Sequence, residues 1–361
     1  MQLTIKTDIF KEMVSRSIKG ASQNKLIPLT SLMAIQLKDN VLTLITSDAS
    51  NYLYINQDNV AGDEFYVVVE IEQFSKLIGK MTCENITLEV EDKILKVKGN
   101  GDYKIELPLD EEGNSITFPD PVAKIKKSKK KPIEIDITTF RTILNTIKPA
   151  LAATMEVPVY TRYYMGEIVM ATDTYKISSL NADVLHTDPL LMAADTMNLL
   201  EVMTCEKIGF QRVDDILLFT TPDCIVYGHE VDGVNDYQID KIGKLLKQQL
   251  KSKCKLDRNA LLAILDRIGL FVGQYDNKAI ILTFTETGVE ISSKASTGVE
   301  ILNYIESEEI VPCRCNVDID MLSTQLKASA AETIQMQFGD GKSLRFVDGN
   351  ITQMISLLYE E

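Results

Sequence analysis

The chain has 361 residues, of which 45% are hydrophobic and 25% are charged, a balance typical of a globular protein. No run approaches the roughly 20 apolar residues of a membrane span, and the start lacks the apolar core of a signal peptide, so we expect a cytoplasmic protein without a membrane partner. The formal net charge of −14 argues against a nucleic-acid partner, because phosphate binding relies on Lys and Arg, but it does not exclude a local positive lining.

A helix is predicted directly after a short first strand. Residues 9–18 have the apolar period of an amphipathic helix, and Thr7 or Asp8 can cap its first turn. Lys11 and Arg16 fall on the opposite, polar face. The apolar face is formed by Ile9, Phe10, Met13, Val14 and Ile18.

Strands and a second helix complete this first unit. Lys25 lies in a polar loop, and alternating apolar residues then predict strands between residues 32 and 69. The second helix carries Lys76 and Lys80 on its polar face, and a strand meander ends the unit at residues 107–108.

The chain repeats this order of elements. Residues 81–86 read MTCENI, residues 203–208 read MTCEKI, and a degenerate third copy at residues 329–334 reads SAAETI. The isoleucines of the three copies are 208 − 86 = 122 and 334 − 208 = 126 residues apart. Such a period indicates repeated domains, since solenoid units run roughly 20 to 50 residues.

The second and third units follow the same plan. Asp136 can cap a helix whose polar face carries Arg141 and Lys148. Asp257 can cap the first helix of the third unit, and the last helix is expected at residues 320–328. Each unit thus contains two amphipathic helices and about eight strands, and the expected fold class is α+β.

Lys-rich segments separate the units. Residues 119–132 have no apolar periodicity, so they form either a solvated connector or a strap that attracts phosphate. A second Lys-rich connector is expected at residues 241–255. The predicted division is a first domain at 1–121, a linker at 122–132, a second domain at 133–248 and a third domain at 249–361.

No catalytic or metal centre is predicted. The six cysteines are scattered, and Cys313 and Cys315 on one strand would point to opposite faces, so free thiols are expected rather than zinc ligands or a disulfide. Neither histidine belongs to a nucleophile motif. The acidic pairs at 214–215 and 308–309 are candidates for an enzyme centre, but neighbouring residues on a strand face opposite ways. We therefore expect a protein that is not an enzyme and has no cofactor.

Several motifs resemble a known family, the bacterial DNA polymerase III β subunit, or sliding clamp, over essentially the whole chain. Residues 171–177, ATDTYKI, are similar to that family's Ala-Thr-Asp-x-His-Arg-Leu turn, and Phe118-Pro119 is similar to the end of its first domain. Residues 235–237, NDY, resemble its Phe-Pro-Asp-Tyr, and residues 354–358 resemble its hydrophobic C-terminal strand.

The resemblance implies a ring of two chains joined head to tail, in which six domains surround double-stranded DNA and helices line the hole. Binding to DNA would be independent of sequence, because scattered Lys and Arg contact phosphates. The implied lining residues are Lys11, Arg16, Lys25, Lys76, Lys80, Arg141 and Lys148. The implied dimer joint places Tyr103 and Ile105 of one chain against Leu270 and Phe271 of the other.

The resemblance also implies a pocket where polymerases and other replication or repair proteins dock a short peptide. Tyr175-Lys176 replaces the family's His-Arg, Asn235 replaces Pro, and Ser356-Leu357 replaces an apolar residue followed by Pro. The matching positions are Tyr160, Thr172, Thr174, Tyr175, Lys176, Ile177, Asn235, Ile239, Met354, Ser356 and Leu358.

A third partner, an ATP-dependent clamp loader, is implied because the chain has no Gly-rich phosphate loop with Lys of its own. Two alternatives come from other classes of protein: the enzyme weighed above, and a protein scaffold that does not bind DNA, which the acidic balance permits.

Overall fold

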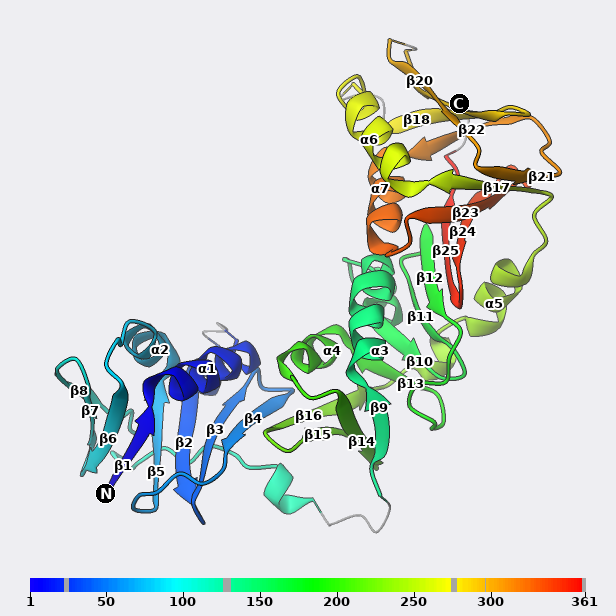
Figure 1. Ribbon diagram of the computed structural model, residues 1–361. Coiled ribbons are helices and arrows are strands. Elements are labelled where there is room, and N and C mark those ends of the chain that lie inside the picture. The colour runs from blue at the N-terminus through cyan, green and yellow to red at the C-terminus, as the bar shows by residue number, and fades with distance from the viewer. Residues whose placement is uncertain (23–25, 126–130, 274–277, 296, 359–361) are drawn as a thin grey trace. The chain divides into compact units, whose positions relative to one another are not determined.

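The computed structural model describes residues 1–22, 26–125, 131–273, 278–295 and 297–358 (Figure 1). The chain forms two compact units. Unit 1 comprises Met1–Thr138 and Asp195–Glu230, and unit 2 comprises Thr139–Ala194 and Val231–Glu361. Within the described ranges, no helix is both long enough and apolar enough to cross a membrane.

Unit 1 contains two antiparallel sheets. One has the strand order β1-β6-β7-β8, and the other runs β5-β2-β3-β4-β16-β15-β14-β9. Its helices are α1 (Thr7–Ser17), α2 (Ile71–Gly79) and α4 (Ala194–Leu199), the last followed by the 3-10 turn η7 (Leu200–Val202). Its strands are β1 (Gln2–Lys6), β2 (Leu32–Lys38), β3 (Val41–Ser47), β4 (Tyr52–Gln57), β5 (Phe65–Glu70), β6 (Asn85–Glu91), β7 (Ile94–Lys98), β8 (Asp102–Glu106), β9 (Ile133–Asp136), β14 (Lys207–Val213), β15 (Ile216–Thr221) and β16 (Cys224–Val231).

Unit 2 is built in the same way. One sheet has the order β13-β10-β11-β12-β25-β24-β23-β17-β21, and the other runs β20-β19-β18-β22. Its helices are α5 (Ile239–Lys247), α6 (Arg258–Gly269) and α7 (Ile319–Ala328), while α3 (Ile137–Thr142) spans the boundary of the two units. Its strands are β10 (Arg162–Met165), β11 (Val169–Thr172), β12 (Lys176–Leu180), β13 (Leu190–Ala193), β17 (Ser252–Asp257), β18 (Ala279–Phe284), β19 (Gly288–Ser293), β20 (Val299–Asn303), β21 (Glu306–Glu308), β22 (Cys313–Asp318), β23 (Thr333–Phe338), β24 (Ser343–Asp348) and β25 (Ile351–Ser356).

The element order repeats three times along the chain: one strand, a helix, four strands, a helix and three strands. The repeats are β1–β8 with α1 and α2, β9–β16 with α3 and α4, and β17–β25 with α6 and α7, the last with the extra strand β21. The predicted repeat and the α+β class are confirmed, whereas the exact domain boundaries stay a prediction. Helix α5 lies outside this order, so the expectation of a simple Lys-rich connector at 241–255 was wrong.

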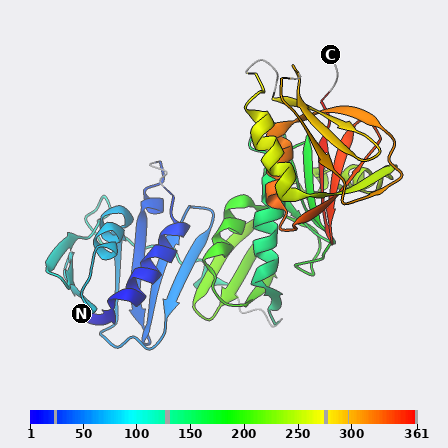
Figure 2. The same cartoon turned by 45° about the horizontal axis from the view of Figure 1, so that its top comes forward.

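The helices pack their apolar faces as amphipathic helices do. In unit 1, α1 contacts α2, where the rings of Phe10 and Phe74 meet edge to face at 6.0 Å between centroids. In unit 2, α6 and α7 lie side by side (Figures 1 and 2). Asp257 caps α6 as predicted, accepting a hydrogen bond of 2.7 Å from the Ala260 N–H.

The start of α1 differs from the prediction. Lys6 occupies the cap position without a side-chain hydrogen bond, so neither Thr7 nor Asp8 is the cap. Asp8 instead lies in the first turn, where its charge favours the positive end of the helix dipole. Ile9 and Ile18, expected on the apolar face, are each 37% exposed.

A buried hydrogen bond in unit 1 links α4 to the turn before β4. The hydroxyl of Thr196 donates to Oδ1 of Asn51 at 2.6 Å, and both side chains are buried. Gly228 of β16 lies against this pair: a Cβ added to it would stand 2.7 Å from Thr196 Cγ2 and 2.8 Å from Asn51 Oδ1. Only a residue without a side chain fits there.

We predict that Gly228→Ala lowers the free energy of unfolding by about 1–3 kcal/mol, the usual cost of overpacking a close contact. Urea denaturation monitored by circular dichroism measures this change. The matched control is Gly79→Ala in α2, where an added Cβ has no atom within 4 Å, and stability there should be unchanged or raised. Equal effects of the two substitutions would contradict the assignment of this contact.

Candidate nucleic-acid and partner interfaces

Basic side chains extend from the helices of both units. In unit 1, Lys11 is half-buried, Lys80 is exposed, and the exposed Lys76 forms an ion pair with Glu72 at 2.6 Å. In unit 2, Arg141 on α3 and Lys148 at the start of the 3-10 turn η5 (Lys148–Ala150) are exposed. Lys25 lies outside the described residues.

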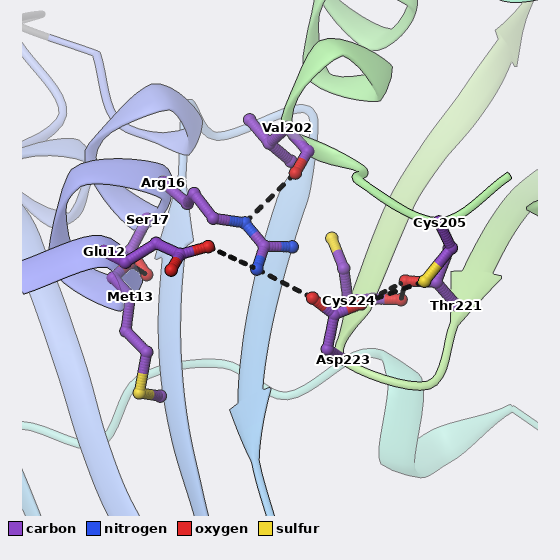
Figure 3. A network of polar contacts seen from close by, with 9 residues as sticks. All are labelled: Glu12, Met13, Arg16, Ser17, Val202, Cys205, Thr221, Asp223 and Cys224. Atoms are coloured by element: carbon purple, nitrogen blue, oxygen red, sulfur yellow. Dashed lines mark hydrogen bonds and ion pairs between the residues drawn. The ribbon is translucent and has the colours of Figure 1, made fainter. Parts of the chain in front are cut away.

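Arg16 is placed differently from these residues, and its expected position on an outward polar face was wrong. Its Nη1 donates to Oδ2 of Asp223 at 2.7 Å and its Nε donates to the carbonyl oxygen of Val202 at 3.0 Å (Figure 3). The Arg16 side chain is only 14% exposed. The turn between β15 and β16 brings Asp223 to α1, and the resulting charge-assisted hydrogen bond holds the guanidinium inside unit 1.

The Asp223 carboxylate is the centre of this network. Burial acts to raise its pKa, but hydrogen bonds from Arg16 and from the Thr221 hydroxyl, at 2.8 Å, outweigh burial and hold the pKa below the usual aspartate range. The thiol of Cys205 lies 3.8 Å from the same carboxylate. Burial raises the pKa of the neighbouring Cys224 thiol to about 12, so this cysteine is a protonated core residue rather than a nucleophile.

A cavity of about 690 Å³ lies beside Arg16 within unit 1. Four carboxylates line it, against the two cations Arg16 and Lys19. The lining comes from α1, α4, η7 and the loops near them, and it consists of Glu12, Ser15, Arg16, Lys19, Ala21, Ser22, Asp48, Asp195, Asn198, Leu199, Glu201, Val202 and Thr204. The helices of unit 1 therefore present a mixed surface and not a uniformly basic one.

Three of the residues expected for a peptide pocket belong to one apolar cluster in unit 2. Tyr160, Ile177 and Met354 pack together and are 7%, 7% and 5% exposed. Met354 lies opposite Ile177 in the β12–β25 ladder. We name this set the docking cluster; its buried members are Tyr160, Tyr164, Met170, Ile177, Leu191, Tyr237, Ile242 and Met354.

The turn before β12 shapes one border of the docking cluster. The Thr172 hydroxyl donates to the Lys176 carbonyl at 2.8 Å, and Thr174 has a φ of 80°, a left-handed conformation that costs a threonine strain. Tyr175 at the tip is 61% exposed. Lys176 Nζ is 3.4 Å from Asp173 Oδ2, so its charge is already paired within the turn and a partner carboxylate would compete with Asp173.

The remaining expected pocket residues are only partly gathered here. Ile239 is half-buried against the cluster, Asn235 is exposed in the connector before α5, and the Ser356 N–H donates to the Tyr175 carbonyl at 2.8 Å. Leu358 pairs with Asn316 next to β22 and does not belong to the cluster.

Sequence analysis missed several members of the docking cluster. Tyr237 belongs to the NDY motif but was not expected in the pocket. Its ring packs against those of Tyr160 and Tyr164, with centroid distances of 5.2 and 5.3 Å. Ile242 lies in the segment that was expected to be a connector. Its spacing from Ile239 and Leu246 is the sequence pattern that indicates a helix there.

The expected dimer residues lie on the edge strand β8 and directly after helix α6. In the part of the chain that the structure describes, β8 pairs only with β7 and β20 only with β19. Leu270 and Phe271 are 83% and 51% exposed beside α6, and Tyr103 on β8 is 38% exposed. Ile105 is 4% exposed, so its side chain is buried within unit 1 and does not project outward as expected.

Strand β20 adds two residues to this surface that sequence analysis did not identify. Val299 and Ile301 alternate along the strand and are 48% and 67% exposed. Apolar alternation on a strand predicts one buried face, and here that face is uncovered within the described residues.

No protein-family model matches the sequence, and no curated protein sequence matches it. Solved structures do match over the full length. The β subunit of DNA polymerase from Streptococcus pyogenes is 16% identical with a TM-score of 0.87, and the DNA polymerase sliding clamp from Bacillus subtilis is 16% identical with a TM-score of 0.86; in both comparisons 100% of each chain is covered. The DNA polymerase III subunit beta from Borrelia burgdorferi, solved with a natural product, is 14% identical with a TM-score of 0.86 and the same coverage.

The fold is therefore that of a DNA sliding clamp. More narrowly, it is the fold of the bacterial DNA polymerase III β subunit, the family that the repeats and motifs of the sequence resemble.

We predict that Asp223→Asn lowers the free energy of unfolding at pH 7 by about 1.5–3 kcal/mol, the range for a hydrogen bond to a charged group. The native pKa of Asp223 is depressed, so the unfolded chain takes up the proton first as the pH falls. Stability contributed by this group is present above the ordinary aspartate pKa of about 3.9 and is lost as the pH falls through the native value.

Urea titrations between pH 7 and pH 3 measure this loss. The difference in stability between the parent and Asp223→Asn should shrink as the pH falls. The control is Asp214→Asn, which changes an exposed carboxylate on the preceding turn. A difference that stays constant with pH would show that the Asp223 charge does not stabilise unit 1.

Proposed function

We propose that this chain is a DNA sliding clamp, in which two copies join head to tail, encircle double-stranded DNA and tether a polymerase to it. The observation that carries the proposal is the pattern of sheet edges. In the second and third repeats, the last strand pairs with an edge strand of the repeat before it: β16 pairs with β4, and β25 pairs with β12.

The same rule leaves one edge of each kind open. Strand β20 holds the place in the third repeat that β4 and β12 hold in the first and second, and β8 holds the place of β16 and β25. A second copy supplies the missing partner for both edges. Exposed Leu270, Phe271, Val299 and Ile301 would be covered in such a joint, which gives it an apolar contribution beyond the backbone hydrogen bonds.

The charge distribution supports a clamp held by topology more than by affinity. The exposed cations Lys76, Lys80, Arg141 and Lys148 stand on helices, whereas the whole chain carries −14. A few phosphate contacts give weak binding that is independent of sequence. A closed ring needs no more, because weak contacts permit sliding.

The remaining partners follow from the same proposal. A polymerase and other replication or repair proteins would dock on the docking cluster of unit 2, a separate ATP-dependent loader would open the ring, and the protein would act in the cytoplasm on the nucleoid. The chain would have no catalytic role of its own.

We predict that the chain, placed on a nicked circular plasmid by the loader of its host, remains bound through gel filtration and is released when the plasmid is linearised. The double variant Arg141→Glu with Lys148→Glu should load more slowly. For each phosphate contact that is lost, the slope of log affinity for DNA against log salt concentration should fall by about one. The matched control is Lys251→Glu with Lys342→Glu, which makes the same charge change at exposed positions outside the helices of unit 2. Equal retention on circular and linear DNA would overturn the clamp proposal.

We also predict that Leu270→Asp with Ile301→Asp converts a dimer into a monomer. Each side chain would lose roughly 1.5–3 kcal/mol of burial, and 1.4 kcal/mol corresponds to about tenfold in affinity. Sedimentation at micromolar concentration measures the mass. Val311→Asp is the control, since Val311 is 52% exposed but lies outside β20, and a parent protein that is already monomeric would contradict the joint.

A further inference from the structure

Helix α5 covers the docking cluster. Ile242 is 6% exposed and is itself a buried member of the cluster, and the half-buried Ile239 and Leu246 pack against it. The exposed residues Lys241, Lys244 and Lys247 occupy the other face of the helix. Tyr160, Ile177 and Met354, at which a partner's peptide would dock, are buried in the same cluster.

The covering helix is weakly built. It has nine residues, no side-chain cap bond at its N-terminus, and a glycine, Gly243, in its interior. Short helices are marginal without tertiary packing, and an interior glycine weakens them further. Leu245 on the same helix is 46% exposed, so a large apolar side chain contributes little to holding the helix down.

The segments on both sides of α5 are firmly held. Tyr237 before it is 1% exposed and Leu250 after it is 6% exposed. Arg345 of β24 ties the helix directly, with Nη2 donating to the Leu245 carbonyl at 2.8 Å. Burial lowers the pKa of Arg345, and its buried Nε lacks a hydrogen-bond partner. The tie is thus a single hydrogen bond from an imperfectly satisfied guanidinium.

We propose that α5 is a built-in occupant of the docking cluster: a partner's peptide reaches Tyr160, Ile177 and Met354 by displacing α5, while Tyr237 and Leu250 stay anchored. This inference rests on the proposed clamp function for the identity of the partner, but the opening of α5 does not depend on any partner. The peptide that displaces it must offer apolar side chains spaced as Ile239, Ile242 and Leu246 are.

The first test measures opening without a partner. Met354→Cys is introduced into the parent chain, and the rate at which its thiol reacts with a maleimide reports how often α5 uncovers the cluster; the chain without this substitution gives the background of the six native cysteines. Adding Ile242→Ser should speed labelling tenfold or more. Adding Gly243→Ala should slow it two- to fivefold, the ratio that corresponds to about 0.5–1 kcal/mol of helix preference for alanine over glycine.

Gly243→Ala keeps this test decisive if Ile242→Ser fails to fold. An added Cβ at Gly243 meets no atom within 4 Å, so the substitution acts on the helix and not on the packing. Gly79→Ala in α2 is the matched control and should leave labelling unchanged. Equal labelling rates for the parent and Gly243→Ala would overturn the proposal.

The second test uses the C-terminal peptide of the host's replicative polymerase as the probe. Its affinity should fall two- to fivefold with Gly243→Ala and should be unchanged by Gly79→Ala. If the parent chain and Gly243→Ala bind the peptide with equal affinity, α5 does not compete with the peptide. A peptide that binds no variant, while labelling follows the expected order, instead overturns the proposed docking function and leaves the opening of α5 established.

Discussion

Antiparallel pairing between sheets of successive repeats is the constraint on which the rest of the structure depends. Residues 52–55 of β4 pair with residues 224–227 of β16, and residues 176–180 of β12 pair with residues 351–355 of β25. The β4–β16 pairing merges two groups of four strands, and the β12–β25 pairing merges a group of four with a group of five. Both pairings satisfy backbone groups that an edge strand would leave open. The β12–β25 ladder also brings Ile177 and Met354 together in the apolar cluster of unit 2.

The two ladders are reinforced by different polar contacts. In unit 1, Asn51 and Thr196 form one short buried hydrogen bond, and the ion pair between Arg16 and Asp223 lies near the same sheet. In unit 2, a buried chain of uncharged groups serves instead: Gln353 donates to Gln325 at 2.7 Å, and Ser178 donates to the same Gln325 oxygen at 3.0 Å. The Arg16–Asp223 contact near the first ladder depends on an ionised carboxylate, so acid should weaken it, whereas the hydrogen bonds of Gln353, Gln325 and Ser178 do not depend on ionisation.

Local patterns were sufficient to predict the repeat, the two helices of each repeat and most strands, because each amphipathic period is encoded in a few neighbouring residues. The docking cluster was predicted in part: Tyr160, Ile177 and Met354 do meet. What failed depends on contacts between distant segments. Arg16 has the spacing of an outward residue, but distant contacts with Asp223 and the Val202 carbonyl hold it inside unit 1. Helix α5 was missed because Ile239, Ile242 and Leu246, spaced three and then four residues apart, are interspersed with lysines, and their packing on the cluster is what stabilises the helix.

The open edges of β8 and β20 have a consequence for a chain that has not yet met a second copy. An unpaired strand with exposed apolar residues, such as β20 with Val299 and Ile301, is a template for adding foreign strands, and such additions lead to aggregation. The net charge of −14 opposes this, since like-charged chains repel one another over about a Debye length. At low salt, charge repulsion should therefore keep single chains apart. At high salt, where this repulsion is screened, the open strand edges should associate more readily.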